Sequence, residues 1–391
     1  MSSIRLRRSC YARSILVFQF LAAAVCSCGH FYNYAELMLM AFPCFTEMPS
    51  YQLKFLKGAS ELSMVFEFSC ERLRERRTFV MGVAALMIYF AHFYAYADLG
   101  LLNKLFAYGN WGVDVFLLLS GFGMCHSMSK SSSISVFYWK RFVRIGVPYL
   151  IIAIPFCFIS DILIAQTADW GLFALDVSTL SYWLLHRGAW YVAMLVPLYL
   201  LVPLFGRLTN RFGAAFVCVI SAVFCALLSL GFKRSFSDSD FVANVVFVIQ
   251  RLPSFFVGWL LADRLMRGKD RTVGLQVAIL ASGITLFTWF LTRNTGCTGF
   301  LPAMLIAFWV SGFHQLPLEV FFEKLGEASL ESYLLNIYVL AVMRDVFSWG
   351  GVLGYLAVSV VAISGALLVH RLLERPLRLL VARRLDRGAA S

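Results

Sequence analysis

Long apolar stretches alternate with short polar segments along most of the chain. A helix needs about 20 consecutive apolar residues to cross the hydrocarbon core of a bilayer. A shorter and more polar stretch, residues 170–183, is predicted to be part of an outer loop, with a position at the membrane interface as the alternative. The pattern predicts an all-α polytopic membrane helix bundle with about ten core transmembrane helices, near residues 79–97, 110–127, 143–162, 188–206, 213–232, 242–263, 272–291, 298–314, 328–347 and 351–371.

The first 70 residues do not fit this alternation. Four arginines precede an apolar run, SILVFQFLAAAVCSC, which is typical of a signal peptide or of one extra span. A second run, AELMLMAFPCF, offers a return through the membrane, and a start codon placed too far upstream is a third explanation. We therefore divide the chain into an N-terminal region, 1–70, of unassigned status, a membrane domain, 71–380, and a cytoplasmic tail, 381–391.

Composition supports the membrane class. Hydrophobic residues make up 60% of the chain and charged residues 14%, whereas a soluble domain has about 25% charged residues. The net charge of +12 is not accompanied by a long basic tract with interleaved aromatic residues, which argues against nucleic-acid binding. The ten cysteines form no CxxC pair and are predicted to be small buried hydrophobes. No metal site and no bound cofactor are predicted.

The distribution of Lys and Arg predicts the orientation. If residues 71–77, ERLRERR, are cytoplasmic, ten spans place most basic residues inside, as the positive-inside rule expects. The outer side then holds only Lys104, Arg187, Lys233, Arg234 and Arg293. Both ends of the membrane domain are predicted to be cytoplasmic, in the cell (plasma or inner) membrane.

Two titratable side chains fall inside the first two predicted spans. His92 lies about 20 Å into a core of about 30 Å if its span begins on the inner side. Asp114 begins the next span from the outer side, so the two are expected at a similar depth and within contact. A carboxylate that orients an imidazole makes a general base. Packing of His92 between helices and helix capping by Asp114 explain the same spacing.

A third charged residue, Arg251, lies near the middle of its predicted span and precedes Pro253. An arginine at this depth needs an ion-pair partner or a water-filled cavity. The residue is therefore either half of a structural ion pair or a functional group that holds an anion or orients an acyl carbonyl.

A basic segment, FYWKRFVRIGVPYL, enters the third predicted span from the cytoplasm. Its cations are Lys140, Arg141 and Arg144, and the two arginines are three residues apart on one helical face. Ordinary positive-inside charge explains them. Alternatively, the guanidinium groups bind the phosphates of a cytoplasmic ligand, to which their geometry is suited.

Six segments in chain order resemble the membrane acyltransferase-3 family: WGVDVFLLLSGFGM, FYWKRFVRIGVPYL, AWYVAMLVPLYLLVPLF, RLPSFFVGWLLAD, LGEASLESYLLNIYV and LLERPLRLL. The resemblance covers about residues 78–380. The histidine of the family's first core span matches His92, its second-span aspartate matches Asp114, and its basic pair matches Arg141 and Arg144.

The resemblance implies an integral membrane O-acyltransferase. Such a protein moves an acyl group, expected to be acetyl, from cytoplasmic acyl-CoA to a hydroxyl of a cell-envelope or exported carbohydrate or glycolipid. The donor phosphates would be held by Lys140, Arg141 and Arg144. Trp190 and Tyr191 would stack on the acceptor sugar, unless they belong to the interfacial aromatic belt.

The resemblance also implies roles at the reacting centre. His92, oriented by Asp114, would deprotonate the acceptor hydroxyl or bear the acyl group itself. Arg251 would stabilise the oxyanion that forms on the thioester carbonyl.

Two positions depart from the family's pattern. Met81 replaces an arginine that usually precedes the histidine, although Arg77 lies one helical turn away, and Asn336 replaces a common histidine. These departures leave an inactive family member as one alternative. Buried His, Asp and Arg side chains also suit proton-coupled transport, which leaves a transporter or flippase of a glycan or lipid intermediate as the other. The acceptor, the acyl group and the oligomeric state are not specified by the sequence.

Overall fold

The computed structural model describes residues 67–96, 100, 102–131, 133–165, 168–235, 239–292, 297–313, 318–345 and 351–389. The apolar runs that suggested a signal peptide or extra spans lie in residues 1–66, outside the described residues. The chain separates into two units, residues 1–55 and 56–391, and the fold described here is that of the second.

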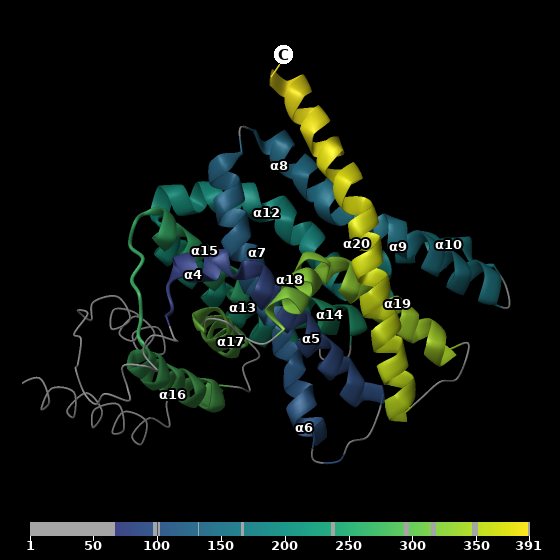
Figure 1. Ribbon diagram of the computed structural model, residues 1–391, viewed down its shortest axis with the longest axis horizontal. Coiled ribbons are helices and arrows are strands. Elements are labelled where there is room, and N and C mark those ends of the chain that lie inside the picture. Colours follow the sequence, from purple (N-terminus) through teal and green to yellow (C-terminus); the bar gives the residue numbers. More distant parts are fainter. Residues whose placement is uncertain are drawn as a thin grey trace, which may run out of the picture. The chain divides into compact units, whose positions relative to one another are not determined.

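The described part is helical and contains no β-strand; one isolated bridge joins Phe68 and Val273. The helices, labelled as in Figure 1, are α4 (Cys70–Glu75), α5 (Arg77–Tyr96), α6 (Leu102–Ala107), η1 (Tyr108–Asn110), α7 (Trp111–Lys130), α8 (Ile134–Arg141), η2 (Phe142–Gly146), α9 (Val147–Phe158), η3 (Ile159–Ile164), α10 (Trp170–Val177), α11 (Leu180–Leu185), α12 (Trp190–Phe212), α13 (Ala214–Ser235), α14 (Asp240–Ile249), α15 (Leu252–Met266), α16 (Leu275–Thr292), α17 (Phe300–Gly312), α18 (Glu319–Glu327), α19 (Ser329–Asp345) and α20 (Gly351–Ala389).

An apolar helix lies at each of the ten predicted spans. Seven segments of the described chain are long and apolar enough to cross a membrane, and three further apolar helices, α5, α17 and α19, are shorter over their described residues. The predicted all-α polytopic bundle is confirmed. The short stretch 170–183 forms the helices α10 and α11 rather than a span.

Prolines interrupt two of the segments that are long and apolar enough to cross a membrane. Pro148 has no N–H for the carbonyl of Arg144, and the chain forms the π-helix η2 there, in which the Val147 N–H bonds to the Phe142 carbonyl. Pro253 likewise cannot donate to the Ile249 carbonyl, so α14 ends at that residue. Both breaks position basic side chains of the candidate site.

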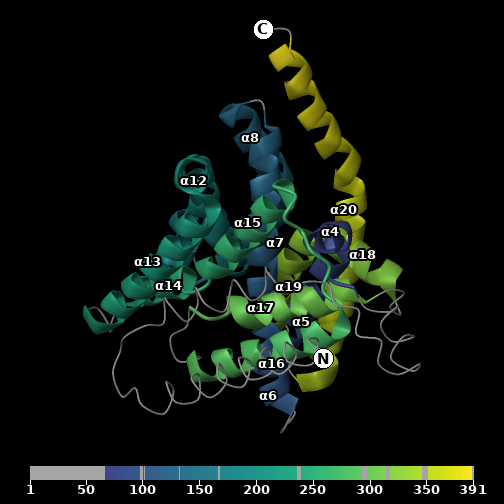
Figure 2. The ribbon, with the colours of Figure 1, turned by 90° about the vertical axis from the view of Figure 1, so that its left-hand side faces the viewer.

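Helix α7 is the centre of the bundle and packs against α5, α15 and α17 (Figure 2). Two glycines let α7 and α15 meet backbone to backbone. A Cβ at Gly121 would come within 1.9 Å of the Phe255 carbonyl oxygen, and one at Gly258 within 1.8 Å of that of Leu118. This close contact fixes the height of α15 against α7, and therefore the position of Arg251 against the first turn of α7.

Candidate active site

The side chain of His92, on α5, contacts Asn336 on α19. The His92 Nδ1 lies 2.9 Å from the Asn336 Nδ2. Asn336 is fully buried, and its Oδ1 has no hydrogen-bond partner among the described residues. The Nδ1 edge of the imidazole is therefore held by a buried amide that lies 244 residues away in the sequence.

Asp114, in the first turn of α7, forms an ion pair with Arg251. The distance from the Arg251 Nη1 to the Asp114 Oδ2 is 2.7 Å, and the Ser254 hydroxyl donates to Oδ1 over 3.1 Å. Both charged side chains are shielded, at 4% exposure for Asp114 and 15% for Arg251. The charge of the Asp114 carboxylate is thus compensated by Arg251, and each of its oxygens has a hydrogen-bond donor other than His92.

The break between α14 and α15 explains this pairing. Arg251 precedes the first residue of α15, where the helix restarts, and its guanidinium lies 4.7 Å from the centre of the Phe247 ring and 5.5 Å from that of Trp190. The aromatic faces and Asp114 together hold the cation.

The structure does not form the hydrogen bond expected between His92 and Asp114. Within the described part of the chain, the partner of His92 is Asn336, and the partners of Asp114 are Arg251 and Ser254. The expectation rested on the short loop between two neighbouring spans. The Arg251 cation, supplied by the break in a distant helix, takes the carboxylate instead.

Three arginines gather around the other end of α7; we call Arg77, Arg141 and Arg144 the arginine cluster. The charges of Arg141 and Arg144 both act on Arg77, which begins α5. Arg141 donates to the Ser127 hydroxyl over 3.2 Å and lies over the ring of Phe137. None of the three forms an ion pair with any residue that the structure describes.

The two predicted acceptor-binding residues are in contact: the rings of Trp190 and Tyr191 meet edge to face, with centroids 6.1 Å apart. Trp190 contacts Arg251 and the ring of Phe247. Tyr191 is buried, and its backbone N–H donates a hydrogen bond to the Tyr333 hydroxyl oxygen over 3.0 Å. Lys140 is half-buried on α8, next to the arginine cluster in sequence. Of the two rings that were predicted to stack on a sugar, Trp190 lies at the Asp114–Arg251 ion pair and Tyr191 lies in the core.

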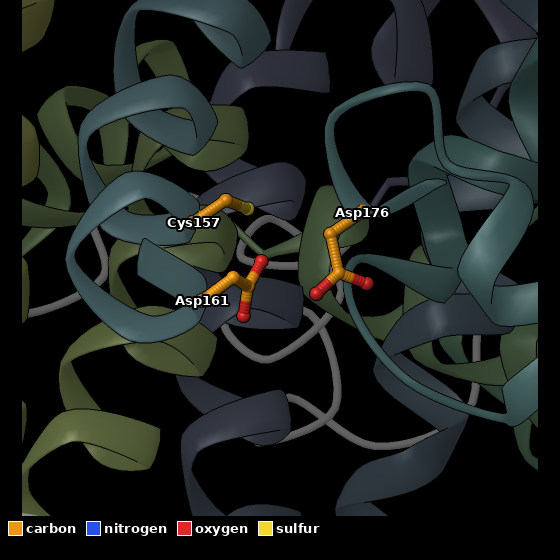
Figure 3. Close-up of side chains that lie close together, drawn as sticks. All are labelled: Cys157, Asp161 and Asp176. Atoms are coloured by element: carbon orange, nitrogen blue, oxygen red, sulfur yellow. The ribbon is translucent and has the colours of Figure 1, made fainter. Parts of the chain in front are cut away.

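A further polar group lies where η3 meets α10. Figure 3 shows the side chains of Cys157, Asp161 and Asp176 turned toward one another, and one ligand atom from each lies within 4.8 Å of the others. The Arg187 Nη2 contacts both carboxylates, each over 3.0 Å. The donor set is one that a divalent cation could use, but Arg187 already compensates much of the negative charge, and we assign no metal here.

The profile of the family described as "Acyltransferase domain" matches residues 80–371. The chain belongs to the acyltransferase-3 family. An acyltransferase of Streptomyces mycarofaciens, "Acyltransferase MdmB", is 25% identical over 354 residues, which cover 77% of this chain and 90% of that relative. No solved structure matches the chain significantly. Together with the apolar helices, these findings describe a multi-pass membrane acyltransferase.

In this acyltransferase, sequence reasoning missed the site residues whose contacts lie far away along the chain. Asn336 stood out only as a departure from the family's pattern, and Arg77 only as a neighbour of Met81. Ser254 bore no signal beyond its place near Arg251. A hydrophobic pattern places such residues on a helix but does not say which helix they face.

Proposed function

We propose that this acyltransferase moves an acetyl or other short acyl group from acyl-CoA to a hydroxyl of a cell-envelope or exported carbohydrate. The observation that supports the proposal best is the spacing along α5. Arg77 begins this helix and His92 follows fifteen residues later, which is about 22 Å along the axis. Cations that have no counter-ion among the described residues and an oriented imidazole are thus separated by roughly the reach of a pantetheine arm.

On the donor side, the arginine cluster provides guanidinium groups that form no ion pair with an acidic residue in the described chain. Guanidinium forks match phosphate oxygens in geometry and charge. We propose that these groups hold the nucleotide end of acyl-CoA at the cytoplasmic face, with Lys140 beside them, while the thioester extends along α5 toward His92.

At the reacting centre, we propose that His92 is the general base. When the Asn336 amide turns its Oδ1 toward the ring, the His92 Nδ1–H donates to it, and Nε2 keeps its lone pair for the proton of an acceptor hydroxyl. The hydroxyl oxygen then attacks the thioester carbon, the C–S bond breaks, and the imidazolium returns the proton to the departing thiolate.

The Asp114–Arg251 pair takes a different part in this proposal from the one the sequence suggested. Because Arg251 is neutralised by Asp114 and lies against Trp190, it forms the polar wall of the acceptor side. It positions the acceptor and shields the centre from water, and Trp190 offers a ring face to a sugar.

The proposal is tested with membranes that contain the protein and radiolabelled acetyl-CoA. We expect label to appear in carbohydrate in a time- and protein-dependent way, and not in membranes from cells that lack the protein. Label that stays in CoA with every envelope acceptor supplied would contradict the proposal. Movement of an intact glycan across the same membranes without transfer of label would favour a transporter instead.

A further inference from the structure

A polar junction of three helices lies one turn from His92. The Tyr89 side chain of α5 reaches α19, where its hydroxyl donates to the Ser332 carbonyl over 3.2 Å and lies 3.1 Å from the Ser332 hydroxyl. From α20, the Tyr355 hydroxyl donates to the Tyr89 carbonyl over 2.7 Å. All three residues are buried. Breaking one of these bonds would leave a buried polar group unpaired, so the junction holds its geometry.

Two side-chain contacts, which we call rungs, join α5 to α19. The first rung is Tyr89 with Ser332, and the second is His92 with Asn336. The rungs are three residues apart along α5 and four along α19, which is about one turn of each helix. Because their order is the same on both helices, α5 and α19 run in the same direction here. A shift of α19 along α5 would therefore move both rungs together.

The first rung is bonded to the helical turn that carries Asn336. In an α-helix the N–H of a residue donates to the carbonyl four residues earlier, so the Ser332 carbonyl is the acceptor for the Asn336 N–H. The Tyr89 hydroxyl donates to that same carbonyl. The Ser332 hydroxyl is placed to donate back to the Tyr89 oxygen. The rung thus holds the backbone to which the Asn336 amide is attached.

We propose that Tyr89 is a positioning residue for acyl transfer: its hydroxyl fixes the height of α19 against α5 and so sets the Asn336 amide against the His92 Nδ1. This inference rests on the proposed function for the role of His92, and it adds a residue that acts through Asn336 rather than on the reacting atoms. Such a residue matters because a misplacement of about 1 Å lowers the rate of a catalysed step about a hundredfold.

The first test is Tyr89→Phe, which removes one oxygen atom and keeps the ring. We expect kcat for transfer of label from acetyl-CoA to fall about three- to tenfold, which corresponds to the loss of one buried hydrogen bond. The KM for acetyl-CoA should stay within about twofold, because Arg77 of the arginine cluster lies twelve residues earlier on α5. Ser332→Ala leaves the carbonyl acceptor in place and should lose less than about twofold.

A double variant separates positioning from an ordinary packing role. If Tyr89 acts through Asn336, Tyr89→Phe should change kcat by less than about twofold in a chain that already carries Asn336→Leu. The matched control is Tyr182→Phe, since the Tyr182 hydroxyl is buried and also donates to a carbonyl, that of Asn244, over 3.2 Å. This control should lower the melting temperature about as much as Tyr89→Phe and leave kcat within about twofold of wild type.

A second readout does not depend on catalysis. Exchange of the His92 Cε1 hydrogen with deuterium, followed by mass spectrometry on the full chain in nanodiscs across a range of pH, reports the surroundings of the imidazole. We expect the pH profile of Tyr89→Phe to depart from that of wild type toward that of Asn336→Leu. Tyr182→Phe should give the wild-type profile.

Two results overturn the inference: wild-type kcat in Tyr89→Phe, or losses in Tyr89→Phe and Asn336→Leu that multiply in the double variant. A larger loss in Ser332→Ala than in Tyr89→Phe also overturns it. If the wild-type protein transfers no label, the proposed function fails and the exchange profiles decide alone. A profile in Tyr89→Phe that shifts toward that of Asn336→Leu then retains the positioning role, and an unchanged profile removes it.

Discussion

The ion pair between Asp114 and Arg251 should dominate the local stability of the α7–α15 contact. At the observed 2.7 Å and an effective dielectric constant of about 20, the attraction is about 6 kcal/mol before the cost of desolvation is subtracted. Removing one partner leaves the other charged and buried. Asp114→Asn and Arg251→Met are therefore each expected to lower the free energy of unfolding by about 3–5 kcal/mol.

The double variant separates the ion pair from other effects of each substitution. With both charges gone, neither is left unpaired, so the combined loss should be smaller than the sum of the two single losses by about 2–3 kcal/mol. The assay is reversible unfolding of the purified protein in mixed micelles by titration with sodium dodecyl sulfate.

A second pair in the same protein serves as the control. Arg267 and Asp263 are one turn apart, with a distance of 2.8 Å, but Arg267 is half-exposed. Such a pair contributes only about 0.3–0.5 kcal/mol. A coupling free energy for Asp114 and Arg251 no larger than that of the control would refute the argument that burial makes this pair strong.

Two further outcomes follow from contacts in the bundle. Asn336→Leu should lower kcat for acyl transfer about tenfold or more, because the ring of His92 loses the partner that sets its tautomer. The KM for acyl-CoA should change little. Asn336→Asp can still accept a hydrogen bond from the His92 Nδ1–H and should retain more activity. Gly258→Ala should destabilise the protein by at least about 1–3 kcal/mol, because its Cβ would overlap the backbone of α7; Gly231→Ala, at a helical position with open space, should leave stability equal or higher in the same unfolding assay.

The positions of the helices could be predicted because each one satisfies a local requirement. A span must be apolar over its length, and its backbone must be satisfied within itself. The break before α15 was not predicted, because residues 242–263 were expected to form one continuous span, although Pro253 lies two residues after Arg251.

The partners of the polar residues could not be predicted in the same way. Asn336 is 244 residues from His92, and Arg251 is 137 residues from Asp114. Neighbouring spans were expected to pair with each other, and this gave the His92–Asp114 contact that the structure does not contain. A carboxylate takes the strongest available cation, and the location of that cation depended on how α15 packs on α7.

The central claim is that His92 is the base of an acyl transfer from acyl-CoA. It is tested most directly by the initial rate at which label passes from radiolabelled acetyl-CoA to carbohydrate in membranes with His92→Ala, compared with His126→Ala on α7 at equal protein level. His126 is also part-buried, but its Nδ1 contacts only the Phe122 carbonyl of its own helix in the described structure. We expect His92→Ala to lose at least about a hundredfold in rate and His126→Ala to transfer at close to the wild-type rate. Transfer by His92→Ala at the wild-type rate would contradict the account.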